Sequence, residues 1–84
     1  MNETVEVEFV GYLGRSTGRY SHKDRLISIK CRELEEMYGT IAHESTHYAM
    51  KTAAEKGIKD EETIAYMVGY TTKEIIKKID CGSK

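Results

Sequence analysis

The spacing of apolar residues changes once along this chain, near Arg32, and that change limits the fold more than any other feature. Before it, Val5, Val7 and Phe9 alternate with polar residues, which is the period of a strand with one buried face. Residues 26–30, LISIK, place two isoleucines on one face in the same way. After Arg32 the apolar residues follow helical spacing. Strands followed by helices predict an α+β domain.

A polar stretch separates the two expected strands. Residues 14–25, GRSTGRYSHKDR, are rich in Gly and Ser and are typical of a loop. We therefore expect the strands at 5–9 and 26–30 to form an N-terminal β-hairpin or a small antiparallel sheet. The outward polar residues of the first strand are expected to form a solvated face.

The first expected helix begins between Cys31 and Gly39. Gly57 is a typical residue just beyond a helix C-terminus, because it adopts positive φ without strain. Lys56 precedes it, where a cation interacts favourably with the negative end of the helix dipole.

Two further helices are expected after Gly57. Asp60 can cap the first of them, EETIAYMVGY, with Glu61 and Glu62 in its first turn. Thr71 and Glu74 have the spacing of a capping box, which predicts a separate third helix, KEIIKKI. The predicted architecture is a single domain, residues 1–84, with the small sheet followed by three helices.

A chain of 84 residues with 39% apolar residues and no Trp has a modest core. Small domains often need a staple such as a disulfide or a metal. Cys31 and Cys81 could form a disulfide. Two cysteines without a secretory signal more often remain reduced thiols, which favours a cytoplasmic location.

Two classes of partner are not expected. The formal net charge of −1 provides no electrostatic footprint for a nucleic acid. No apolar run approaches the length of a membrane span, so a membrane partner is not expected either.

The segment HESTHYAM carries the strongest chemical signal. His43 and His47 are four residues apart and share one helix face, so both imidazoles can bind one Zn²⁺ ion. Glu44 lies about 100° around the helix and can reach a water on the cleft side as a general base. The simpler alternative is two surface histidines beside a glutamate that makes local pairs.

A catalytic zinc site normally takes three protein ligands. The candidates for the third ligand are Glu61, Glu62, His22, Cys31 and Glu74.

The stretch TIAHESTHYAM…GI…DEETIAYMVGY resembles the small zincin-type metallopeptidases of phages and prophages. In that pattern the HExxH helix is followed, after a Gly-Ile turn, by a helix reading E-x-x-A-Y-x-x-G-Y. The resemblance covers roughly residues 40–70 and matches its glutamate to Glu62. It implies a minimal zincin-like fold, a gluzincin-like site of His43, His47 and Glu62, and metallopeptidase activity.

The residues around Glu62 give a separate reason to choose it as the third ligand. Glu62, Ala65 and Gly69 share a face, and two small residues on that face allow close helix packing. Gly57 comes ten residues after His47, which is about 15 Å of helix. Glu62 can therefore reach the metal only if the helices cross steeply or the first helix ends early.

A peptidase also needs a group that stabilises the oxyanion. Tyr66 and Tyr70 are the expected donors, with Tyr48 as another candidate. The alternative is that each tyrosine lies at the edge of the core. The strand at 26–30 is expected to bind extended substrate through its free edge.

The predicted function is a zinc-dependent peptidase that acts on a peptide or protein substrate, with Glu44 as general base. The main alternative is a small binding or inhibitory protein of phage type in which the zinc is structural. A metal-free helical module is the third interpretation. A free edge strand also makes a homodimer plausible.

Overall fold

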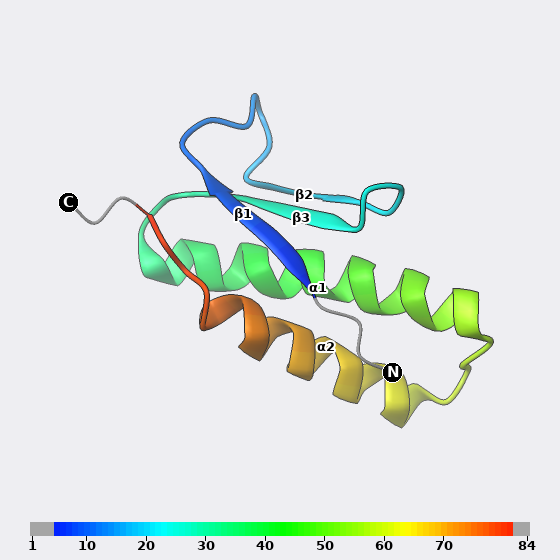
Figure 1. Cartoon of the computed structure of the whole chain (residues 1–84). Coiled ribbons are helices and arrows are strands. Elements are labelled where there is room, and N and C mark those ends of the chain that lie inside the picture. The colour runs from blue at the N-terminus through cyan, green and yellow to red at the C-terminus, as the bar shows by residue number, and fades with distance from the viewer. Residues whose placement is uncertain (1–4, 82–84) are drawn as a thin grey trace.

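The computed structural model describes residues 5–81, which form a three-stranded sheet followed by two helices (Figure 1). The elements in chain order are β1 (Glu6–Val10), β2 (Gly18–Ser21), β3 (Leu26–Lys30), α1 (Leu34–Lys56) and α2 (Glu61–Ile76). The sheet lies against α1, and α2 packs on α1 below it (Figure 1).

The sheet is mixed, with strand order β1-β3-β2. β1 pairs with β3 in parallel and β2 pairs with β3 antiparallel. The predicted antiparallel pairing of residues 5–9 with 26–30 is therefore wrong. The hairpin partner of β3 is β2, which lies in the stretch expected to be a loop. Tyr20 is its one large apolar residue, so β2 lacks the alternation that reveals a strand.

The expected buried faces of the other two strands are confirmed. Ile27 and Ile29 have no exposed surface and pack with Met37 and Ile41 of α1. Val5 is also buried in this core. Because β3 lies in the centre, both of its edges are paired. The expectation that residues 26–30 offer a free edge is therefore wrong, and β2 forms that outer edge of the sheet.

Both expected signals between the helices are confirmed. Gly57 ends α1 with φ 71°, and its N–H is directed to the carbonyl oxygens of Ala53 and Ala54. The side chain of Asp60 accepts a hydrogen bond of 2.9 Å from the backbone N–H of Thr63. The Thr63 hydroxyl donates a second bond of 2.7 Å to the same oxygen. The hydroxyl bond first, and then the backbone bond, lower the pKa of Asp60 below its ordinary 3.8. The turn between the helices is thus fixed at both ends.

The predicted third helix is wrong, because α2 runs without a break from Glu61 to Ile76. Thr71 lies inside α2 and is only 2% exposed, so it packs in the interior instead of capping a new helix. Glu74 forms an ion pair of 3.3 Å with Lys77. Within residues 5–81, neither helix is long and apolar enough to cross a membrane.

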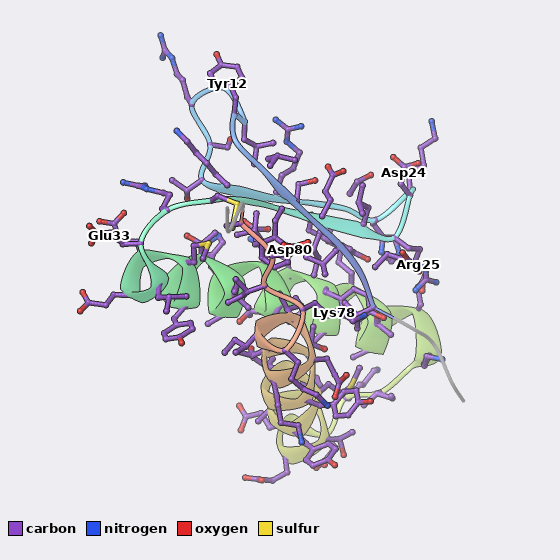
Figure 2. The ribbon with its side chains drawn as sticks, turned by 60° about the vertical axis from the view of Figure 1, so that its left-hand side comes forward. Tyr12, Asp24, Arg25, Glu33, Lys78 and Asp80 are labelled. Carbon is purple, nitrogen blue, oxygen red and sulfur yellow. A yellow bond between two sulfur atoms is a disulfide. The ribbon has the colours of Figure 1, made fainter. Side chains whose placement is uncertain are left out.

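A disulfide joins Cys31, just after β3, to Cys81, beyond the end of α2. It closes a segment with a sequence separation of 50 residues. Figure 2 shows it as a yellow bond beside Asp80. At the other end of β1, Lys78 Nζ donates a 2.9 Å hydrogen bond to the carbonyl oxygen of Val5. The preference for reduced thiols is therefore wrong for this structure.

Reduction of the disulfide is expected to destabilise the fold strongly. Closing a loop of this length lowers the free energy of folding by about 4 kcal/mol through loss of chain entropy in the unfolded state. In a domain of this size each kcal/mol shifts the melting temperature by roughly 4–8 °C. Thermal melts followed by circular dichroism should therefore show a drop of more than about ten degrees in reductant.

The matched control is the Cys31→Ser/Cys81→Ser double variant. It should melt like the reduced protein whether or not reductant is present. An unchanged melting temperature on full reduction of the wild type would contradict the stapling role.

Candidate metal and peptide site

His43 and His47 form the histidine pair on neighbouring turns of α1, with both rings exposed. Their Nε2 atoms lie 3.2 Å apart. Two nitrogens at 2.0–2.1 Å from a tetrahedral zinc ion are separated by about 3.3 Å. The histidine pair therefore fits two corners of a zinc site without rearrangement.

The histidine pair faces away from the packed side of α1. Ser45 and Ala49 each follow a histidine by two residues, about 200° around the helix, and both have no exposed surface. Ala53 continues this stripe of small residues and lines a hollow with Ile64 of α2. Small residues at four-residue spacing let α2 approach this side of α1, opposite the histidines.

Glu62 lies apart from the histidine pair. It is exposed at the start of α2, at the end of the helical hairpin where α1 finishes (Figure 1). Within residues 5–81, no group of three His, Cys, Asp or Glu side chains could hold one metal ion. The structure therefore brings His43 and His47 together and does not bring Glu62 to them.

The other candidate ligands have different surroundings. Glu61 is exposed in the first turn of α2, beside Glu62. His22 is hydrogen-bonded to Glu55, and Cys31 is in the disulfide. Glu74 is held in its ion pair on α2. None of these side chains joins the histidine pair in the described residues.

Glu44 is only 6% exposed because β2 crosses it at Gly18. A Cβ atom at Gly18 would lie 3.0 Å from Cγ and 3.2 Å from Oε2 of Glu44. It would also collide with the Cγ2 methyl of Thr40. The absence of a side chain at Gly18 thus lets β2 pack directly over the carboxylate.

Two open clefts meet at Glu44. The first, of about 690 Å³, lies on the His43 side, and we name it the His43 cleft. The second, of about 300 Å³, lies on the His47 side and is named the His47 cleft. Gly18 and Glu44 line both clefts. Glu44 is therefore the one carboxylate shared by the two hollows beside the histidine pair.

The free edge of β2 runs past this carboxylate. The backbone N–H of Lys30 donates a 2.9 Å hydrogen bond to the carbonyl oxygen of Thr17. In an antiparallel ladder, alternate residues point their N–H and C=O groups away from the partner strand. Those residues in β2 are Gly18 and Tyr20, opposite Ile29 and Ile27. The backbone N–H and C=O groups of Gly18 therefore point outward beside Glu44, where they can pair with an extended chain.

A hydrogen-bonded clamp holds the β2–β3 hairpin on α1. The phenol of Tyr20 lies 2.6 Å from Nδ1 of His22, and Nε2 of His22 lies 2.7 Å from Glu55. A neutral ring that accepts from Tyr20 at Nδ1 donates to Glu55 at Nε2. Arg25 donates to the second carboxylate oxygen at 2.8 Å, reaching from the hairpin toward α1 (Figure 2).

The clamp changes the acidity of its carboxylate. The hydrogen bond from His22 is the largest cause that lowers the pKa of Glu55 below its ordinary 4.5, and the charge on Arg25 adds to it. The negative charge on Glu55 is therefore part of what fixes β2 over Glu44.

Tyr66 and Tyr70 lie elsewhere. They are 74% and 48% exposed on α2 and line a mainly apolar hollow of about 160 Å³ with Thr52 of α1. That hollow shares no lining residue with the two clefts at Glu44. Tyr20 lines the His47 cleft instead. The structure therefore does not bring Tyr66 or Tyr70 to the clefts beside the histidine pair.

Gly18 and Tyr20 are the site residues that the sequence did not reveal. The only signal was the alternation RYSH at residues 19–22, in which Tyr20 stands between polar residues. With a single apolar residue, this alternation is too short to distinguish a strand from a loop.

The candidate site thus consists of two exposed histidines and a buried glutamate on α1, together with the outer edge of β2. Comparison of the chain with family models, curated proteins and solved structures finds no match. The likeness to zincins therefore rests on the residues of α1 and the first part of α2.

Gly18→Ala is expected to destabilise the fold and to move β2 away from Glu44. The new methyl meets Thr40 and Glu44, and overpacking of this kind costs about 1–3 kcal/mol in free energy of unfolding. Chemical denaturation should measure the loss.

Gly11→Ala is the matched control, because a Cβ at Gly11 meets nothing within 4 Å. Thr40→Ser removes the colliding methyl and should restore part of the stability in the double variant. Equal stability of Gly18→Ala and wild type would show that β2 does not pack this closely.

Glu55→Gln is expected to lower the melting temperature near neutral pH and to have no effect in acid. The folded-state pKa of Glu55 is depressed, so the ionised carboxylate contributes stability above pH 4.5. That contribution is lost as the pH falls through the folded-state pKa. Thermal melts of variant and wild type across this range should converge below pH 4.5.

Glu6→Gln provides the control, since Glu6 is exposed on β1 at the other edge of the sheet. It should change the melting temperature little at any pH. A Glu55→Gln difference that persists unchanged in acid would show that loss of the carboxylate charge is not its cause.

Proposed function

We propose that this chain is a zinc-dependent peptidase that cleaves an extended peptide bound along β2. The observation that carries the proposal is the position of Glu44. It lies buried beneath β2 and lines the clefts on both sides of the histidine pair. A buried carboxylate between two metal-binding side chains and a free strand edge is suited to general-base catalysis.

The substrate would extend the sheet. Gly18 offers outward backbone groups, and the peptide pairs with them as an added strand on the outer edge of β2. Because β2 crosses α1 at Gly18, a peptide on this edge passes beside Glu44. Main-chain hydrogen bonds would hold the substrate independently of its sequence, and the two clefts would receive its side chains.

His43 and His47 would hold the zinc ion through their Nε2 atoms. A bound zinc ion supplies Lewis acidity and makes water a better nucleophile. Glu44 accepts the proton of the attacking water and delivers it to the leaving nitrogen of the peptide. β2 keeps the peptide backbone in place during both proton transfers.

Glu62 is the third ligand that the resemblance to zincins implies. It is exposed at the far end of the helical hairpin, so it reaches the histidine pair only if α2 moves. The arrangement described here supplies two protein ligands, one fewer than catalytic zinc sites usually have.

The lack of a third protein ligand favours a second candidate function, in which the chain binds a peptide and does not cleave it. A purely structural zinc is less well supported. Both histidines belong to one helix, so an ion between them joins no separate parts of the fold. The disulfide already ties the end of β3 to the segment after α2.

Purified protein is expected to bind close to one zinc per chain, and His43→Ala or His47→Ala should abolish the binding. Glu44→Gln should keep the zinc and the melting temperature but lose peptide cleavage, because only the base is removed. Elemental analysis, thermal melts and a screen of peptide libraries measure the three quantities.

The outcomes separate the candidates. Zinc bound equally by wild type and both histidine variants would contradict the metal site. Peptide binding without any cleavage would favour the binding module. Glu62→Ala should leave zinc affinity unchanged if α2 keeps its place, with Glu61→Ala as the control. A selective loss in Glu62→Ala would show that α2 moves and completes the site.

A further inference from the structure

The clefts beside Glu44 carry more positive than negative charge. The cationic side chains that line them are Arg15, Arg19, Arg32 and Lys51. Two carboxylates line the same surface, Glu36 and the buried Glu44. The whole chain has a formal charge of −1, so this excess is local to the clefts.

Cationic side chains lie in both clefts. Arg15, in the segment before β2, and Arg32, between β3 and α1, line the His43 cleft. Lys51 lies one turn beyond His47 on α1 and lines the His47 cleft. Arg15 and Lys51 are exposed. A peptide on the β2 edge therefore passes a cation on either side of Glu44.

One of these charges is partly neutralised. Arg32 forms an ion pair of 2.7 Å with Glu36, one turn along the chain. Arg15 in the His43 cleft and Lys51 in the His47 cleft, where Arg19 adds a further charge, are therefore the cations that we take to select a ligand. Clefts lined by one sign of charge raise the local concentration of oppositely charged ligands and reject like charges.

We propose that the substrate is an acidic extended peptide, with carboxylate side chains on both sides of the residue that passes Glu44. This inference rests on the proposed function, since the same strand edge and clefts hold the peptide. Backbone pairing with β2 fixes the position of the peptide, and Arg15 and Lys51 select its side chains. Arg15 and Lys51 repel a lysine-rich peptide and so exclude it from both clefts.

The test measures binding apart from cleavage. Zinc-loaded Glu44→Gln protein is titrated into a fluorescent peptide of alternating Glu and Ala, and anisotropy reports binding. Peptides of equal length with Gln or Lys in place of Glu provide the comparison. The Glu peptide should bind most tightly, and the Arg15→Glu/Lys51→Glu change should weaken it on the order of tenfold. Salt should reduce the preference, because these charges are exposed.

Lys59→Glu, in the loop before α2 and outside both clefts, is the matched control for total charge. It should leave the binding of the Glu peptide unchanged. Equal binding of the three peptides, or an equal loss in Lys59→Glu and in the cleft variants, would overturn the proposal. Cleavage by the wild type without acidic preference would retain the peptidase and overturn only the substrate class. Preference for the acidic peptide without any cleavage would retain the class of ligand and overturn the peptidase.

Discussion

The contact between Gly18 and Glu44 decides where β2 lies, and the candidate site depends on that position. Without a side chain at Gly18, the strand packs directly over the carboxylate and the neighbouring Thr40 methyl. The clamp through Tyr20, His22 and Glu55 holds the other end of the hairpin on α1. Two contacts thus orient one short strand, and its outer edge passes the carboxylate.

The division of α1 into two sides explains how so small a domain keeps a polar site. Its buried side carries small and apolar residues that pack on the sheet and on α2, and the histidine pair lies on the exposed side. The disulfide ties the end of β3 to the segment after α2.

The sequence predicted the features that depend on neighbouring residues. The cap at Asp60, the helix end at Gly57 and the closeness of His43 to His47 all follow from local spacing. It could not predict features set by distant contacts. The parallel pairing of β1 with β3 and the identity of the edge strand depend on residues far apart in the chain. Thr71 resembled a cap by its spacing, but burial keeps it inside α2.

The position of Glu62 shows why a motif in sequence does not complete a site in space. The αL residue Gly57 and the cap at Asp60 fix a tight turn, so α2 returns along the buried side of α1. Residues at the start of α2 then lie beside the end of α1, several turns beyond His47. The turn that stabilises the hairpin therefore also keeps Glu62 away from the histidine pair.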